Sequence, residues 1–275
     1  MKIICLIKPS PPLIYFVNRI HEEHGVSLVV VEKGQTGVGE IIRKMRKHGL
    51  CRSLQIALSQ LGGRRRRQND FNRFFGRKWK SLDPDIPRFE VENINSELVH
   101  RRLDEEHADL LLDHGTSIVK DHILETAELA FNLHWGLSPY YRGTLCTNWA
   151  LLNWDPNNIG VTIHKLSRAI DGGDIVVQRR AEITADDTCH SINMKLTKLG
   201  TVAVIDVVTR LKRGEQLEFH FQDLRQGYLS YLRQWSWILE LQIARIEKRG
   251  YIGRMLKHPA RRERLPIVEL NGGND

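Results

Sequence analysis

The chain has 275 residues, of which 41% are hydrophobic and 27% are charged, and its 41 Lys and Arg outnumber its 33 Asp and Glu for a net charge of +8. This composition is close to that of an average globular protein and excludes a disordered or collagen-like chain, while the length predicts one large domain or two smaller ones. The positive charge predicts an anionic partner, such as a nucleic acid, a phosphorylated metabolite, a polyglutamate or a membrane surface.

The first thirty or so residues have the pattern of a βαβ unit. Residues 3–7 form a short apolar run typical of a strand buried on both faces, and residues 26–31 form a second one. Between them, residues 13–24 have helical spacing and end before Gly25, a plausible helix stop. Two such strands joined by a helix require a parallel sheet.

A basic segment follows, with four consecutive arginines at residues 64–67. We interpret residues 41–88 as a basic insert, whose ordinary role is a solvated loop or helix face. Aromatic side chains among its basic ones, at residues 71, 74, 75 and 79, leave open a role in contacting phosphate or a partner.

The alternation of strands and helices then resumes. We predict strands at residues 89–91, 108–112, 130–134, 161–166 and 175–177, and helices at residues 96–106 and 191–210. This pattern predicts an α/β fold with an open, mostly parallel twisted sheet, which binds its ligands at the carboxyl ends of the strands. Beyond Gly214 we expect one more strand at residues 217–221, an aromatic-rich amphipathic helix at residues 234–249 and a frayed basic tail.

Cysteine spacing and apolar run lengths bear on the compartment. The four cysteines, at positions 5, 51, 146 and 189, are far apart and predict reduced thiols rather than a disulfide framework or a zinc ribbon. The first residues lack the pattern of a secretory signal, and no apolar stretch of about 18 residues predicts a membrane-spanning helix. We therefore expect a cytoplasmic protein.

Polar side chains gather where the strand at residues 130–134 ends. Asn132 and His134 are two residues apart and project from the same face of that strand. Asp171, in the turn sequence IDGGDI, is expected to meet His134 across adjacent strand ends and to raise its basicity. Asn132 would donate an N–H to a developing oxyanion. Because no G-x-S-x-G nucleophile pattern occurs, these residues favour direct acyl transfer to an amine over a covalent acyl-enzyme.

The joint order of the motifs resembles the folate-dependent formyltransferase family. These motifs are N-x-H at 132–134, SPYYRG at 138–143, WALLN at 149–153, GVTIH at 160–164 and IDGGDI at 170–175. The resemblance is dense over residues 105–200. It implies a Rossmann-like formyltransferase core at residues 1–210, with a short, partly helical C-terminal extension at residues 211–275.

The resemblance also implies the chemistry and the site. Asn132, His134 and Asp171 would be the catalytic residues, 10-formyltetrahydrofolate would be the formyl donor, and no metal would be needed. A primary amine would attack the formyl carbon directly and form a tetrahedral intermediate. The candidate folate contacts are Ser117, Ile118, Val119, Ser167, Arg168, Ala169 and Ile170, and the candidate acceptor contacts are Tyr140, Tyr141 and Arg142.

Three functions remain open for such a chain. A nucleotide-linked amino sugar is the favoured acceptor. The glycinamide ribonucleotide enzymes of the family carry a Gly-rich phosphate loop after the first strand, where this chain has prolines, so that substrate is disfavoured. The tRNA enzymes carry a C-terminal barrel, for which the 65 residues after the core are too few. An aminoacyl-tRNA is the alternative, as in methionyl-tRNA formyltransferases, and a non-catalytic basic binding module is the second. Trp135-Gly136 beside the catalytic His departs from the Pro-Ser of many relatives. The aromatic helix after Gln234 is a candidate homodimer surface.

Overall fold

The computed structural model describes residues 1–33, 71–72, 74–257 and 264–270 of the chain. Most of the predicted basic insert, including the arginines at residues 64–67, lies outside these residues, as does Cys51. Within the described part, three of the aromatic residues of the insert, Phe71, Phe75 and Trp79, are buried. Phe75 and Trp79 contact the ring of Tyr15, so these aromatic side chains belong to a small hydrophobic cluster.

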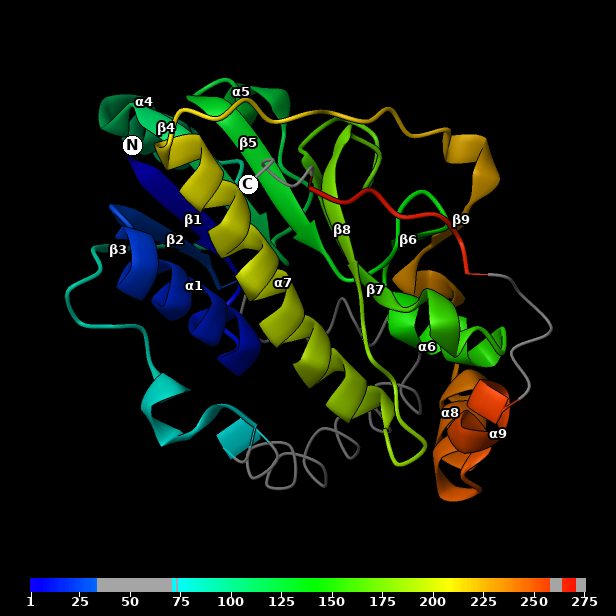
Figure 1. The fold of residues 1–275 in the computed structure, drawn as a ribbon. Coiled ribbons are helices and arrows are strands. Elements are labelled where there is room, and N and C mark those ends of the chain that lie inside the picture. The colour runs from blue at the N-terminus through cyan, green and yellow to red at the C-terminus, as the bar shows by residue number, and fades with distance from the viewer. Residues whose placement is uncertain (34–70, 73, 258–263, 271–275) are drawn as a thin grey trace.

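Seven strands form one sheet in the order β3-β2-β1-β4-β5-β7-β8 (Figure 1). They are β1 (Ile3–Ile7), β2 (Leu28–Glu32), β3 (Arg88–Val91), β4 (Ala108–His114), β5 (Ala127–His134), β7 (Gly160–Lys165) and β8 (Ile175–Arg180). The pairs from β3 to β5 are parallel, whereas β7 runs antiparallel to both β5 and β8. The predicted α/β fold with an open, mostly parallel sheet is confirmed.

Helices cover both faces of this sheet (Figure 1). The long helices α1 (Pro11–His24) and α7 (Cys189–Lys212) pack side by side on one face, and α4 (Glu97–Glu106) and α5 (Asp121–Leu124) cover the other. The boundaries follow local chemistry. Pro11 begins α1, Gly25 ends it with a φ of 73°, and a reciprocal Thr188–Ser191 capping box begins α7.

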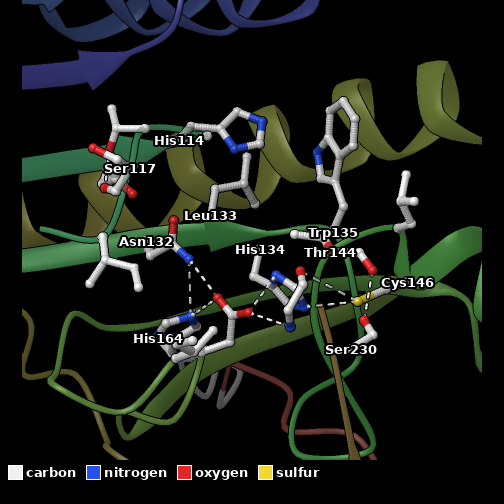
Figure 2. A pocket seen from close by; sticks show the side chains of 18 of the residues that line it. His114, Ser117, Asn132, Leu133, His134, Trp135, Thr144, Cys146, His164 and Ser230 are labelled. Carbon is white, nitrogen blue, oxygen red and sulfur yellow. Dashed lines mark hydrogen bonds and ion pairs between the residues drawn. The ribbon is translucent and has the colours of Figure 1, made fainter. Parts of the chain in front are cut away.

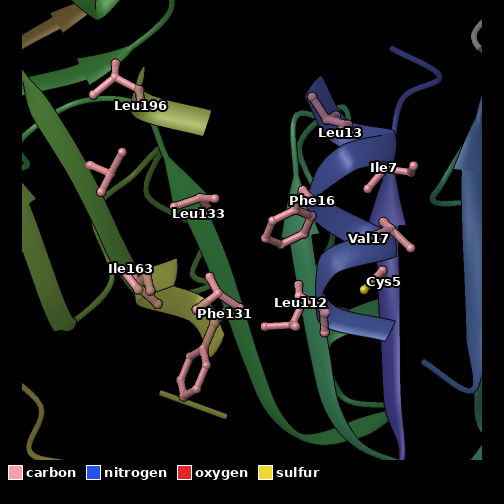
Figure 3. Close-up of a cluster of buried hydrophobic side chains, with 14 of the residues drawn as sticks. Cys5, Ile7, Leu13, Phe16, Val17, Leu112, Phe131, Leu133, Ile163 and Leu196 are labelled. Carbon is pink, nitrogen blue, oxygen red and sulfur yellow. The ribbon is translucent and has the colours of Figure 1, made fainter. Parts of the chain in front are cut away.

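The main hydrophobic core lies between the sheet and the helices α1 and α7 (Figure 3). Strand residues alternate between the two faces of the sheet, so Phe131 and Leu133 of β5 enter this core. Asn132 and His134, between and after them, project from the opposite face. The same alternation in β4 sends Leu112 into the core and directs Asp113 to the other face. Asp113, Asn132 and His134 therefore lie on the same side of the sheet.

The C-terminal third differs from the prediction in several places. It contains a helix at Tyr251–Lys257 that was not predicted, and residues 264–270 of the tail predicted to be frayed are tied to β8, where the Gln178 N–H donates to the Val268 carbonyl oxygen at 2.6 Å. The strand predicted at residues 217–221 is wrong, because His220 makes only an isolated bridge to Ile175. The strand of this region is β9 (Tyr228–Ser230), which pairs in parallel with β6 (Tyr141–Gly143) in a separate two-stranded sheet. Strands of three residues are too short to have a detectable period.

The remaining elements connect or follow the sheet. They are α6 (Cys146–Leu152), α8 (Trp237–Lys248), α9 (Tyr251–Lys257) and the short 3-10 turns η1 (Arg77–Lys80), η2 (Pro156–Asn158), η3 (Leu224–Gln226) and η4 (Leu232–Gln234). Helix α8 confirms the predicted C-terminal helix, with Ile243 and Ile246 buried and Trp237 and Leu241 exposed. No helix in the described ranges combines the length and apolar character needed to cross a bilayer.

Candidate active site

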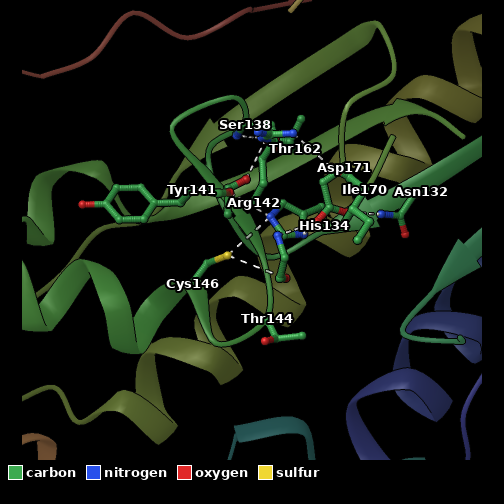
Figure 4. A network of polar contacts seen from close by, with 12 residues as sticks. Asn132, His134, Ser138, Tyr141, Arg142, Thr144, Cys146, Thr162, Ile170 and Asp171 are labelled. Carbon is green, nitrogen blue, oxygen red and sulfur yellow. Dashed lines mark hydrogen bonds and ion pairs between the residues drawn. The ribbon is translucent and has the colours of Figure 1, made fainter. Parts of the chain in front are cut away.

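The predicted catalytic residues meet at the carboxyl end of β5. Asn132 and His134 leave the sheet on the same face and are 9% and 7% exposed. Strand β7 is antiparallel to β5 and places His164 opposite Asn132. The chain between β7 and β8 then returns to this point and brings Asp171 against His134 (Figure 4). The same carboxylate lies 3.5 Å from His164 Nε2. The expected meeting of Asn132, His134 and Asp171 is observed.

Two glycines allow the chain to approach this closely. A Cβ atom on Gly173 would lie 1.9 Å from the carbonyl oxygen of Lys165, so the return of the loop to the sheet leaves no space for a side chain there. Gly143 has a φ of 91°, and a Cβ atom on it would lie 2.0 Å from the carbonyl oxygen of Ser230. Its N–H donates to Asp171 Oδ2 at 2.7 Å. The backbone of β6 therefore helps to hold the Asp171 carboxylate.

Asp171 is ionised in this arrangement. Burial raises the pKa of Asp171, but His134, His164 and the Gly143 N–H more than offset burial, and the pKa lies well below its usual value. Asn132 Nδ2 also donates to Asp171 Oδ1 at 3.2 Å. The carboxylate is thus a fixed negative charge at the base of the site.

His134 has an oxygen atom of the protein facing each of its ring nitrogens. Its Nε2 lies 3.0 Å from the Tyr141 carbonyl oxygen, which can only accept a hydrogen bond, so Nε2 carries the proton. Its Nδ1 faces Asp171 Oδ2 at 3.4 Å. Burial lowers the pKa of His134 and outweighs the carboxylate, contrary to the expected rise in basicity. A proton taken up by Nδ1 would create an imidazolium paired with Asp171.

His164 is a site residue to which the sequence analysis gave no role. It is 2% exposed. Its Nδ1 donates to the Lys165 carbonyl oxygen at 2.7 Å, which leaves Nε2 as an acceptor for Asn132 Nδ2 at 3.1 Å. Both amide hydrogens of Asn132 therefore point to His164 and Asp171. An oxyanion-binding role for Asn132 requires one of these N–H groups to turn toward the cavity. The signal that identifies His164 is its cross-strand register with Asn132, which depends on the antiparallel pairing.

These residues line a cavity of about 590 Å³ (Figure 2). Six of the seven candidate folate contacts line the same cavity: Ser117, Ile118 and Val119 after β4, and Ser167, Ala169 and Ile170 before Asp171. Arg168 does not, since it points to solvent and pairs with Asp121. The two loops supply apolar surface and backbone groups on either side, which suits a flat, partly polar ring.

Glu32 holds the first of these loops in place. The Glu32 carboxylate accepts hydrogen bonds from the Ser117 N–H at 2.8 Å, from the Ser117 hydroxyl at 2.5 Å and from the Ile94 N–H at 3.1 Å. Burial raises the pKa of Glu32, but these hydrogen bonds and Lys8 leave it below the usual value. Glu32 is 3% exposed and sits at the end of β2, where sequence alone gave no reason to select it.

The candidate acceptor contacts lie outside the lining of this cavity. The Tyr141 hydroxyl donates to Asp155 at 2.7 Å in the interior. The Arg142 guanidinium reaches the carbonyl oxygens of Ile170 at 3.4 Å and Leu224 at 3.2 Å, and so ties the loop that carries Asp171 to η3. Tyr140 lines a separate hollow with Tyr228. The next residues, from Gly143 to Asn148, line the cavity instead.

Cys146 and Trp135 flank the His134 imidazole. Cys146 Sγ lies 3.6 Å from His134 Nε2, and burial raises the pKa of its thiol, so it is a neutral neighbour rather than a thiolate. The ring of Trp135 packs edge-on against His114, with ring centroids 5.2 Å apart, away from the Asp171 side of His134. Within the described ranges, no group of three or more His, Cys, Asp or Glu side chains is arranged to hold a metal ion.

Comparison with known proteins agrees with this architecture. The solved structures that share the fold include a sugar N-formyltransferase from a Shewanella species, at 16% identity over 85% of this chain and 78% of that one, with a TM-score of 0.55. An N-formyltransferase from Helicobacter canadensis is similar at 16% identity over 86% and 73% of the two chains, with a TM-score of 0.53. A phosphoribosylglycinamide formyltransferase from Anaplasma phagocytophilum matches at 18% identity over 78% and 88%, with a TM-score of 0.52.

The family assignment rests on the sequence match. The model of the formyl transferase family matches residues 61–208, a range that contains Asn132, His134, His164 and Asp171. The matched range is more than half of the 275 residues. The chain therefore belongs to the formyl transferase family.

Proposed function

We propose that this protein transfers a formyl group from 10-formyltetrahydrofolate to the primary amine of a nucleotide-linked amino sugar. The observation that carries the proposal is the meeting of Asn132, His134 and Asp171 at a cavity that is lined by both loops expected to contact folate. The Helicobacter canadensis enzyme, which has the same fold, was solved with folinic acid and dTDP-3-aminofucose, and this supports both the donor and the class of acceptor.

The cavity fits the proposed donor in character. Ile118, Val119 and Ile170 give it apolar walls, and the backbone groups of the same loops provide hydrogen-bond partners. When bound, 10-formyltetrahydrofolate supplies an activated formyl group. The protein then has to orient that group, stabilise negative charge on its oxygen and move the protons of the attacking amine.

Each catalytic residue has a part in these tasks. One N–H of Asn132, turned from Asp171 while the other stays on His164 Nε2, stabilises the negative charge that develops on the formyl oxygen. His134 accepts a proton at Nδ1, and the ionised Asp171 stabilises the resulting imidazolium. Gly143 and His164 keep Asp171 and Asn132 in position. Holding donor and amine in one cavity lowers the entropic cost of their meeting.

The proposal is tested by the release of tetrahydrofolate from 10-formyltetrahydrofolate in the presence of a panel of nucleotide-linked amino sugars. We expect turnover with at least one of them, and a loss of about 100-fold or more in kcat for His134→Ala and for Asp171→Ala. Asp186→Asn, an exposed carboxylate away from the cavity, is the matched control. Methionyl-tRNA is included as the alternative acceptor. Turnover with methionyl-tRNA alone would show that the acceptor is an aminoacyl-tRNA. The absence of both turnover and folate binding would refute the proposed enzymatic activity.

A further inference from the structure

A second carboxyl group, that of Asp113, lies beside the catalytic residues and has no part in the steps above. Asp113 is near the carboxyl end of β4, in direct register with Asn132 of β5. Leu111, two residues earlier, packs in the core beneath α4, so Asp113 leaves the sheet on the same face as Asn132. It lines the 590 Å³ cavity and is 7% exposed.

Asp113 has no cationic partner among the residues that the structure describes. Its one hydrogen bond there comes from the Thr116 hydroxyl, which donates to Oδ1, and no residue in the described ranges is a partner of Oδ2. The ionisable groups whose charges reach it are Glu32 of β2, His164 of β7 and Asp171 of the β7–β8 loop. Lys8, which follows β1 and also lines the cavity, lies 3.8 Å from Glu32 Oε2 and is paired there.

The two neighbouring carboxylates are already occupied by the protein. Glu32 accepts hydrogen bonds from Ser117 and Ile94. Asp171 accepts from Gly143 and Asn132 and faces His134. Asp113 alone of the three presents a carboxylate oxygen without a described partner at the cavity. A buried carboxylate without a counter-charge is costly, so it takes up either a proton or a cationic ligand.

The pKa of Asp113 is close to neutral, so the protonated and ionised forms of its carboxyl group are both accessible. Burial raises the pKa of Asp113 to about 7, with smaller contributions from Asp171 and Glu32 in the same direction, and the Thr116 hydrogen bond opposes the rise. Near neutral pH, Asp113 can therefore both pair with a cation and accept a proton. The acceptor of formyl transfer is such a cation, because a primary amine is an ammonium ion in neutral water.

We propose that Asp113 binds the ammonium group of the acceptor and takes its first proton. The inference rests on the proposed formyl transfer. The step R–NH₃⁺ + Asp113–COO⁻ → R–NH₂ + Asp113–COOH frees the nitrogen lone pair, which forms the new bond to the formyl carbon. The bond from that carbon to the folate nitrogen then breaks. His134 moves a second proton from the amine to the departing folate nitrogen, the third hydrogen stays on the formamide, and Asp113 returns its proton to solvent.

The test compares the pH dependence of kcat/KM for the acceptor in four proteins. The wild type should rise to a plateau through a pKa near 7 as Asp113 ionises. Asp113→Asn keeps the shape of the side chain and should lose that rise. It should fall by about 100-fold at pH 7 and recover at high pH, where the amine is neutral in solution. Thr116→Val removes the hydrogen bond that lowers the pKa of Asp113, so its rise should move to higher pH.

The control and the contradicting outcomes separate this inference from the proposed function. Asp186→Asn, which removes an exposed carboxylate, should match the wild type. The KM for 10-formyltetrahydrofolate should stay within about twofold in every variant, which a general loss of structure would not allow. If the wild type transfers formyl and Asp113→Asn keeps its pH profile, or Thr116→Val leaves the rise in place, the role of Asp113 is refuted. If the wild type transfers no formyl group, the proposed function fails and this role with it.

Discussion

His164 lies between the Asn132 side chain and the Lys165 carbonyl oxygen, and two substitutions distinguish the roles of its two ring nitrogens. Nε2 accepts from Asn132 at 3.1 Å, and Nδ1 donates to the Lys165 carbonyl oxygen at 2.7 Å. His164→Gln places an amide oxygen near the position of Nε2, so Asn132 keeps its acceptor. His164→Asn places an amide nitrogen near the position of Nδ1 and no atom near the position of Nε2, so the Asn132 N–H loses its acceptor. The two variants carry the same amide group and differ by one methylene, so only Gln reaches the position of Nε2.

The magnitude follows from the burial of this contact. His164 is 2% exposed, and a buried donor left without an acceptor costs about 1–3 kcal/mol. If that free energy serves to fix the Asn132 amide for the reaction, its loss corresponds to roughly 5- to 150-fold in kcat. We therefore expect His164→Asn to fall by that factor and His164→Gln to stay within about threefold of the wild type.

The assay is tetrahydrofolate release under saturating donor and acceptor, with urea unfolding of the same samples. His100→Gln, the same change on the surface helix α4, is the control and should leave both measurements unchanged. The free energy of unfolding should fall further in His164→Asn than in His164→Gln. Equal activity of the two variants would refute the assignment of Nε2 as the acceptor that fixes Asn132.

Three further predictions concern the supports of the site. Gly143→Ala should lower the free energy of unfolding, measured with urea, by about 3 kcal/mol or more, because its Cβ would meet Ser230. Gly214→Ala, at a glycine with a φ of 74° and open space around it, should lower it by about 1 kcal/mol. Equal losses in the two variants would contradict the steric reason. Glu32→Gln should raise the KM for 10-formyltetrahydrofolate several-fold and leave the KM for the acceptor unchanged, since its carboxylate holds the Ser117 loop; a change in the acceptor KM alone would contradict this. Because the pKa of Asp171 is lower in the folded than in the unfolded protein, its ionised form stabilises the fold above about pH 4, and this contribution is lost as the pH falls below that value. Urea unfolding of Asp171→Asn should therefore show a larger deficit relative to the wild type at pH 7 than at pH 3.

The parts of the molecule predicted from sequence are those with a local signal. The continuous apolar runs of β1 and β2 and the spacing of α1 identified the parallel half of the sheet. Asn132 and His134 followed from the two-residue period of β5. In the structure these elements form an open, mostly parallel sheet with helices on both faces, as the alternation of strands and helices indicated.

The missed features depend on contacts between distant segments. His164 joins the site only because β7 is antiparallel to β5, and nothing within residues 160–165 specifies that direction. Asp113 and Glu32 are single carboxylates at strand ends, and their function depends on partners that come from other strands and loops. Strands β6 and β9 have three residues each, too few for a period, and their pairing joins positions 141 and 228.

That last pairing has a consequence for the order in which the protein can become active during synthesis. Gln222 donates to the carbonyl oxygen of Asp171, Leu224 accepts from Arg142, and the Ser230 hydroxyl donates to the carbonyl oxygens of Arg142 and Thr144. A nascent chain released at residue 210 would already contain Asn132, His134 and Asp171, together with every strand of the large sheet. It would keep the hydrogen bonds from Gly143 to Asp171 and from Arg142 to Ile170, but it would lack those made by Gln222, Leu224 and Ser230. The last contacts around the Asp171 loop are therefore made by residues that are synthesised well after every strand of the large sheet.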